Sequence, residues 1–160
     1  MNEQTFRKTK GEYIIDTDLD LIDRELVHRY LSTESYWAKG VPFETVSKSI
    51  DHSLCFGLYH GSRQIGFARM VTDRATFTYL ADVFILEEER GKGLSKWMME
   101  MIDSHPDLQG LRRWMLGTRD AHGLYEQFGW TVITEEQRGR FMQKHFPEVY
   151  KSLSLRNDLH

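Results

Sequence analysis

Cysteine is almost absent from this sequence: Cys55 is the only cysteine among its 160 residues. A single thiol excludes an internal disulfide and suits a reducing compartment, so we expect a cytoplasmic protein. No apolar run approaches the roughly 20 residues of a membrane-spanning helix, and the first residues lack the apolar core of a secretory signal. We therefore expect no membrane association.

A large excess of one charge is also missing. The net charge is −3, with 21 basic and 24 acidic residues mixed along the chain. Binding to nucleic acid needs a basic surface, so we expect no nucleic-acid partner. The seven histidines show no ligand spacing with one another or with Cys55, so we expect no metal. Cys55 lies in an apolar stretch and is predicted to be a core residue.

Repeats, low-complexity tracts and linker-like segments are absent too. The length suits one ordinary domain, and the hydrophobic and charged fractions, 40% and 28%, are those of a soluble globular protein. We interpret residues 1–10 as a loose polar lead and residues 11–160 as the domain.

Apolar periodicity and turn residues predict a chain that mixes helices and strands. The strands are expected at 13–15, 53–60, 63–72, 76–86, 111–117 and 130–133. The helices are expected at 16–31 with Asp18 or Asp20 as the cap, at 43–51, from 94 to just before His105, and at 120–128. Part of 138–150 is expected to form a last strand or helix. Strand 76–86 is apolar on both faces, as in a strand covered on both sides. The fold class is therefore α/β, a mixed sheet with helices on both faces.

The turn after strand 76–86 has the composition of a phosphate-binding site. It reads Arg90-Gly91-Lys92-Gly93-Leu94-Ser95 and opens the clearest amphipathic helix of the chain. A helix start offers unpaired N–H groups and the positive end of a dipole, and glycines let a ligand approach the backbone. A solvated charged turn is the alternative that these residues alone leave open.

Two other phosphate-binding motifs do not fit this turn. A Walker A loop needs the pattern G-x-x-x-x-G-K-[ST], but Gly91 and Gly93 are too close together. The dinucleotide fingerprint needs a third glycine where Lys96 stands. Both motifs are excluded.

Two segments resemble the GNAT N-acetyltransferase superfamily. Residues 79–86, followed by Arg90-x-x-Gly93-x-Ser95, are similar to its motif A, a strand leading to [Q/R]-x-x-G-x-[G/A] at a helix start. Residues 121–130, AHGLYEQFGW, are similar to its motif B, A-x-x-L-Y-x-x-x-G-[F/W]. Ser95 departs from the family's Gly or Ala.

A second departure is Thr118, which stands where many members have Asn. The resemblance implies a single-domain GNAT-like fold whose mostly antiparallel sheet is splayed at the motif A strand. It also implies an N-acetyltransferase that moves acetyl from acetyl-CoA to an amine by direct attack in a ternary complex. We favour a small-molecule amine. A non-catalytic acyl-CoA-binding regulatory domain and a protein lysine or N-terminal acetyltransferase remain alternatives, and the protein is expected to be a monomer or homodimer.

The family's cofactor contacts carry over to the strand and to the turn. The pantetheine arm would pair with the backbone of Val83, Phe84, Ile85 and Leu86. The thioester carbonyl would point at a strand N–H near Val83 or Phe84, which stabilises an oxyanion. The pyrophosphate would lie at the turn, on Arg90, Gly91, Lys92, Gly93, Leu94 and Ser95.

The resemblance also implies a general acid, Tyr125, which would protonate the leaving thiolate. Helical spacing alone favours a core tyrosine at this position, and the motif reverses that preference. Asp82 is the first candidate for a base, because a carboxylate in an apolar strand is expensive unless paired or useful. An ion pair with Arg69 is an equal alternative. His122 is the second candidate, with a surface histidine as its alternative.

The acceptor pocket of this superfamily lies at the first two helices, here residues 30–40. Aromatic side chains with an acid suit a cationic amine. Packing of Tyr36 and Trp37 in the core is an equal alternative, and residues 87–89 are expected to form a solvated bend. The expected pocket residues are Tyr30, Glu34, Tyr36, Trp37 and His122.

Overall fold

The computed structural model describes residues 5–157, and only the backbone of residues 154, 155 and 157. The chain forms two compact units, residues 1–117 and 118–160, each of which is described by itself. No helix within residues 5–157 is both long and apolar enough to cross a membrane.

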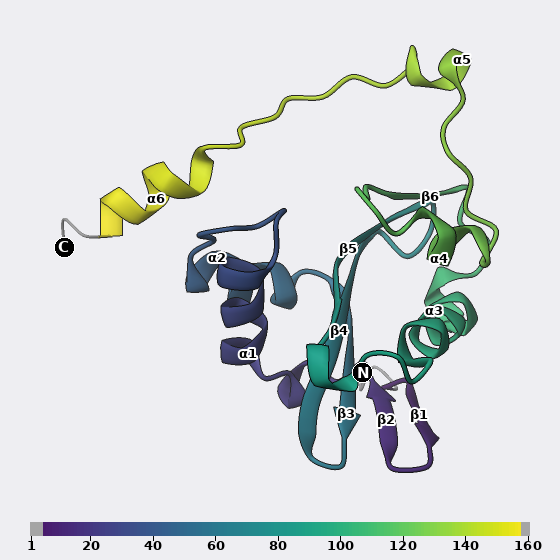
Figure 1. Ribbon diagram of the computed structural model, residues 1–160. Coiled ribbons are helices and arrows are strands. Elements are labelled where there is room, and N and C mark those ends of the chain that lie inside the picture. Colours follow the sequence, from purple (N-terminus) through teal and green to yellow (C-terminus); the bar gives the residue numbers. More distant parts are fainter. Residues whose placement is uncertain (1–4, 158–160) are drawn as a thin grey trace. The chain divides into compact units, whose positions relative to one another are not determined.

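The first unit is built on a six-stranded sheet in which the strands follow the order of the sequence (Figure 1). Every neighbouring pair is antiparallel except the last, β5 with β6, which is parallel. The predicted mixed, mostly antiparallel sheet is therefore confirmed. The strands are β1 (Arg7–Lys10), β2 (Tyr13–Asp16), β3 (Leu54–His60), β4 (Arg63–Thr72), β5 (Phe77–Ile85) and β6 (Arg113–Leu116).

The prediction of a loose lead is wrong for residues 7–10, which form β1. This strand pairs with β2 in register Arg7 to Asp16, and the Arg7 guanidinium lies 2.7 Å from the Asp16 carboxylate. All four residues of β1 are exposed and polar. A strand without a buried face has no apolar alternation, so the sequence pattern could not show it.

Two helical segments cover one side of the sheet (Figure 1). The predicted helix 16–31 is wrong at its start, where the short 3₁₀ turn η1 (Leu19–Leu21) precedes α1 (Arg24–Arg29). Asp18 caps only η1, whereas the Asp23 side chain caps α1 by accepting from the N–H of Leu26. Helix α1 continues into a π-helical turn, η2 (Tyr30–Glu34). Helix α2 (Phe43–Asp51) has the predicted bounds, with Pro42 as its N-cap.

Helix α3 (Leu94–Ser104) lies on the other side of the sheet (Figure 1). His105 is its C-cap, as predicted, and Pro106 opens the 3₁₀ turn η4 (Pro106–Leu108). The apolar face of α3 fills the core against the sheet. Its buried residues are Leu94, Trp97, Met98, Met99 and Ile102.

Strand β5 is less completely covered than its apolar sequence predicts. Thr78 and Leu80 are buried, but Phe77 and Tyr79 on the opposite face remain 37% and 39% exposed. The first unit therefore covers one face of this half of β5 better than the other. Cys55, in β3, is fully buried as predicted.

Residues 118–157, the described part of the second unit, hold three helices, α4 (His122–Glu126), α5 (Glu135–Arg138) and α6 (Val149–Asn157). The predicted strand 130–133 is wrong, because these residues pair with no described strand and Val132 is 60% exposed. Apolar and β-branched residues do not make a strand without a hydrogen-bonding neighbour. The strand option for 138–150 is also wrong, since the only regular structure there is the end of α5 and the start of α6.

Candidate active site

An extra residue in β5 interrupts its pairing with β4. Phe84 pairs with Phe67 and Ala81 pairs with Arg69, so two residues of β5 face the single Ala68 of β4. One of the two, Asp82, has a φ of 53°. Aspartate is among the few residue types that tolerate this left-handed conformation. Such a bulge bends and twists a strand, and it lies at the point where β5 leaves β6.

Beyond the bulge, β5 has no strand on its β6 side among residues 5–117. The pairing with β6 covers only residues 77–80 of β5. The N–H of Leu86 points toward β4, where it donates to the carbonyl of Ile65 at 2.8 Å. Because backbone groups alternate in direction along a strand, those of Ile85 point to the open side. An extended ligand can therefore pair with this stretch as an added strand.

Leu86 contributes less to this open edge than the sequence predicts. Its N–H is bonded to Ile65, and its carbonyl accepts from the N–H of Glu89 at 2.9 Å. The Ile85 carbonyl accepts from Nε of Arg90 at 3.0 Å. By the same alternation, the backbone groups of Phe84, which pairs with Phe67, also point toward β4. The predicted pantetheine contacts of all four residues stay predictions, and those of Phe84 and Leu86 are the weakest.

The turn between β5 and α3 has the form of an anion-binding site. Gly91 and Gly93 both have a positive φ, 77° and 76°, and a Cβ at either position would meet no atom within 4 Å. Gly93 is the N-cap of α3, and no side chain caps this helix. The first N–H groups of an eleven-residue helix are thus left to a ligand or to water, and Ser95 lies half-buried in the same turn.

The two cations of this turn are already held by the protein. Nζ of Lys92 lies 2.8 Å from Oε2 of Glu89. Nη2 of Arg90 donates to the hydroxyl of Tyr30 at 3.2 Å. Each side chain keeps further N–H groups, so both remain able to meet a phosphate.

Glu89 is the residue of this turn that the sequence did not reveal. We expected residues 87–89 to form a solvated bend, but Glu89 is 6% exposed and lies in the 3₁₀ turn η3 (Glu87–Glu89). Besides Lys92, it accepts from the hydroxyl of Tyr13 at 3.2 Å, and its Oε1 lies 3.2 Å from Nδ1 of His60. The hydrogen bonds from Lys92 and then His60 lower the pKa of Glu89 to about 2. Glu89 therefore stays ionised and anchors the turn to β2 and β3.

Asp82 connects the bulge to the predicted acceptor segment. Its Oδ2 accepts from Nε of Arg69 at 2.8 Å, so the ion pair given as an alternative is present. Its Oδ1 accepts from the indole N–H of Trp37 at 2.9 Å. Asp82 and Arg69 have side chains that are 10% and 18% exposed. The pair thus holds Trp37 beside the open stretch of β5.

The remaining acceptor residues of the first unit divide into two groups. Tyr36 and Trp37 are 46% and 42% exposed and meet edge to face at 5.1 Å, so packing in the core is wrong for both. Glu34 is also exposed. Tyr30 is buried instead, stacked on Phe84 with ring centroids 4.0 Å apart. Tyr30 therefore supports β5, whereas the other three present their side chains to solvent.

Tyr125 and His122 both lie on α4 in the second unit. Tyr125 is 9% exposed and packs against the ring of Trp130, with centroids 6.0 Å apart. His122 is exposed at the first position of the helix. The roles of these two residues as acid and base stay predictions.

Comparison with known proteins decides the family. A family model described as an acetyltransferase (GNAT) domain matches residues 51–132. A Gibberella zeae protein named putative acetyltransferase is 34% identical in an alignment of 139 residues that covers 73% of this chain and 77% of that protein. The chain belongs to the GNAT acetyltransferase family. The resemblance of the two motifs is thereby confirmed.

Solved GNAT structures agree with the fold. The crystal structure of a putative GNAT acetyltransferase from Xanthomonas campestris pv. campestris is 48% identical, with a TM-score of 0.82 over 86% of this chain and 96% of that one. Glucosamine-6-phosphate N-acetyltransferase from Arabidopsis thaliana is 16% identical, with a TM-score of 0.55 over 84% of this chain and 98% of that one. The second likeness concerns the GNAT fold alone.

Proposed function

We propose that this GNAT protein transfers an acetyl group from acetyl-CoA to the amine of a small molecule, by direct attack in a ternary complex. The observation that carries the proposal is the continuity of two open features. The unpaired stretch of β5 leads through the Gly91–Gly93 turn into the uncapped start of α3. One ligand with an extended amide arm and a pyrophosphate fits both features in order.

The chain's own groups supply the electrostatic part of this reaction. The amine nitrogen forms a bond to the thioester carbon, the C–S bond breaks, and the thiolate takes a proton. A β5 N–H near Val83 or Phe84 stabilises the oxyanion that develops. Tyr125 gives its phenolic proton to the thiolate. The pyrophosphate is held at the start of α3 beside Arg90 and Lys92, whose positive charges offset its own.

The amine must lose a proton before it attacks. A primary amine with a pKa of about 10.4 is only about 0.1% neutral at pH 7.4, which costs about 4 kcal/mol. We assign the base role to Asp82, with His122 as the second candidate. The Trp37 and Arg69 bonds to Asp82 support an additional role, in which Asp82 positions Trp37 for the acceptor.

The acceptor proposed here is a cationic amine. The exposed rings of Tyr36 and Trp37 and the exposed carboxylate of Glu34 follow one another within a short segment. Aromatic faces attract an ammonium group, and a carboxylate pairs with it. Trp37 is fixed at the open side of β5 by Asp82, where the acetyl group would be presented.

A thiol-release assay with acetyl-CoA and a panel of small amines tests the function. Tyr125→Phe is expected to lower kcat about 100-fold and to leave the Kd for CoA within about twofold, because the ring that packs on Trp130 is kept. Tyr150→Phe serves as the matched control, since Tyr150 has no proposed role. An unchanged rate in Tyr125→Phe would show that the acid assignment is wrong. Tight CoA binding without turnover on any amine would favour a regulatory acyl-CoA-binding domain, and acetylation confined to lysate proteins would favour a protein acetyltransferase.

A further inference from the structure

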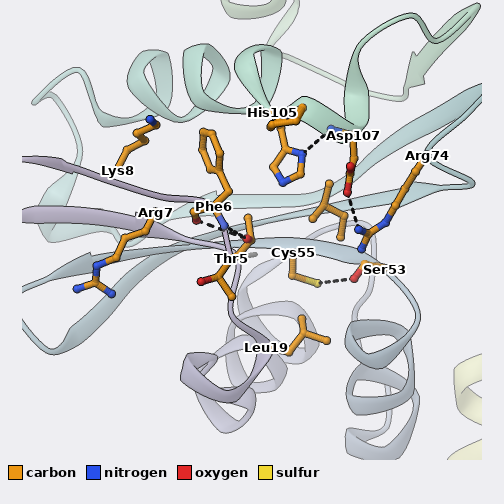
Figure 2. A pocket seen from close by; sticks show the side chains of 13 residues that line it. Thr5, Phe6, Arg7, Lys8, Leu19, Ser53, Cys55, Arg74, His105 and Asp107 are labelled. Carbon is orange, nitrogen blue, oxygen red and sulfur yellow. Dashed lines mark hydrogen bonds and ion pairs between the residues drawn. The ribbon is translucent and has the colours of Figure 1, made fainter. Parts of the chain in front are cut away.

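A hollow lies in the first unit, and its lining includes none of the residues of the proposed acetyl-CoA site (Figure 2). Its volume is about 580 Å³, within the usual range for small-molecule sites. It lies beside the start of β1, the start of β3 and the turn that follows α3. The phosphate turn precedes Leu94 and the hollow includes His105, so the two sites lie at opposite ends of α3. Eleven helical residues separate them by roughly 16 Å.

His105 is the polar group that marks this hollow as a site. The residue is 6% exposed, and its ring packs against Phe6 and Phe56 at 5.0 and 5.6 Å. Its Nδ1 accepts from the N–H of Asp107 at 3.1 Å. In the neutral ring the proton is therefore on Nε2, which has no hydrogen-bond partner among residues 5–157 and points into the hollow (Figure 2). Burial lowers the pKa of His105, so this neutral, donating form is the one present at pH 7.

Positive charge lines the same hollow. Arg7, Lys8 and Arg74 contribute to the lining, against the single carboxylate of Asp107. Arg74 pairs with Asp107 at 2.6 Å and Arg7 pairs with Asp16. Lys8 makes no ion pair with the described part of the chain, and its ammonium lies 5.4 Å from the centre of the Phe6 ring. Lys8 therefore brings a positive charge to the hollow, with the Phe6 ring between its ammonium and His105 (Figure 2).

The rest of the lining combines the hydroxyl residues Thr5, Thr17 and Ser53 with apolar side chains. Phe6, Leu19, Leu54 and Pro106 supply side chains that suit a hydrophobic body. Cys55 also lines the hollow. Burial raises the pKa of its thiol to about 12, so the thiol stays protonated near pH 7 and does not act as a nucleophile.

We propose that this hollow binds a small carboxylic acid with an apolar body. The carboxylate accepts the Nε2–H of His105 and lies in the positive potential of the lining cations, Lys8 among them, while the body lies against Phe6 and Leu54. A carboxylate accepts the N–H and is also attracted by this charge, whereas a neutral amide only accepts the N–H and an ammonium ion does neither.

Phenylacetate, with the uncharged phenylacetamide as its isostere, is a direct probe. Each probe is titrated into the protein and followed by ¹H–¹⁵N NMR. Phenylacetate is expected to shift the signals of the Asp107 amide and of the His105 imidazole nitrogens, and to bind at least about tenfold more tightly than phenylacetamide. Acetyl-CoA at saturation is expected to leave this titration unchanged, because its proposed site is at the other end of α3. Equal binding of the two probes, competition with acetyl-CoA, or no shift at Asp107 would overturn the proposal.

Two variants locate the interaction. His105→Phe keeps an aromatic ring against Phe6 but removes the N–H, and it is expected to weaken phenylacetate binding about tenfold. Because Lys8 is exposed, Lys8→Met is expected to leave the fold intact. It should weaken the binding of phenylacetate about threefold and leave the binding of phenylacetamide unchanged. His145→Phe, an exposed histidine of the second unit, is the matched control. If Lys8→Met binds phenylacetate as tightly as the native protein, the proposal is wrong even where His105→Phe does not fold.

Discussion

Glu89 and Lys92 form an ion pair, with 2.8 Å between Oε2 and Nζ, on the inner side of the turn that precedes α3. The pair is one of three contacts of a carboxylate that is 6% exposed, the others being those with Tyr13 and His60. Because a buried carboxylate is stable only when its partners are in place, the conformation of the turn depends on this residue.

Glu89→Gln is therefore expected to lower Tm more than Glu88→Gln. Glu88 is the matched control, since it is an exposed neighbour that pairs only with the exposed Arg63. The same variant is expected to lower the pKa of His60 in an NMR titration, because Glu89 is one of the two carboxylates that raise it. Equal Tm values for the two variants would show that Glu89 does not anchor the turn.

His60 is expected to stabilise the fold on the acid side of neutrality. The carboxylates of Glu12 and Glu89 raise its pKa above the ordinary 6.5, so the folded protein binds this proton more tightly than the unfolded chain. The stabilisation is complete below pH 6.5 and is lost as the pH rises through the folded pKa. Urea unfolding of His60→Gln should thus differ most from the native protein near pH 6 and least near pH 9. The opposite trend would contradict the assignment.

His105 is expected to act in the reverse direction. Burial lowers its pKa, with a smaller opposing effect from Asp107 and a smaller reinforcing one from Arg74. The unfolded chain therefore binds this proton more readily, and the free energy of unfolding falls as the pH drops below 6.5. Urea unfolding between pH 7.5 and 5 should show a shallower loss for His105→Phe than for the native protein. A parallel loss in the two proteins would show that His105 is not the group responsible.

Asp82→Asn separates the base role from the positioning role. Asparagine tolerates the left-handed backbone at this position, so the bulge is kept while the charge is removed. We expect a stability loss of about 2 kcal/mol, because Arg69 loses its partner in a largely buried pair. If Asp82 is the base, kcat/KM of Asp82→Asn is also lower than that of the native protein. The fall of kcat/KM toward acid pH, which the native protein would show, is then absent from the variant.

Two controls complete this experiment. Asp51→Asn breaks an exposed pair with Arg24 and is expected to cost less than about 1 kcal/mol. Trp37→Phe keeps an aromatic side chain, although a smaller one, and removes the N–H that Asp82 accepts. It is expected to raise KM for the amine with a smaller effect on kcat. A pH profile that is unchanged in Asp82→Asn would assign the base elsewhere, with His122 the next candidate to test.

The parts of the fold that the sequence predicted share a local signal. Pro42 predicts the start of helix α2. The short turn Gly61-Ser62 between two apolar stretches predicts the β3–β4 hairpin. Each signal lies within a few neighbouring residues. Strand β1 carries no such signal, because its four residues are exposed. The predicted strand 130–133 shows the reverse error, since its residue types suit a strand but no partner strand is present.

In the candidate site too, features that depend on neighbouring residues could be predicted, whereas contacts between distant residues could not. The conformation of the Gly91–Gly93 turn could be predicted because it depends on the backbone freedom of two nearby glycines, both of which have a positive φ. The role of Glu89 could not, because its partners Tyr13 and His60 are 76 and 29 residues away in the sequence. The bond between Trp37 and Asp82 spans 45 residues. Spacing along the chain does not encode such contacts, although the Arg69 alternative was accessible because it joins neighbouring strands.

The open half of β5 has a consequence for the protein without its ligand. Unpaired strand edges are templates on which another chain can add and begin to aggregate. Here only residues 81–85 lack a neighbouring strand on the β6 side. This short stretch ends at β6 on one side and, on the other, at the Ile85 carbonyl, which accepts a hydrogen bond from Arg90. So short a gap admits a single narrow chain more readily than a second sheet. An acyl-CoA bound in the proposed way would then protect the folded protein from self-association during storage, in addition to its proposed role as acyl donor.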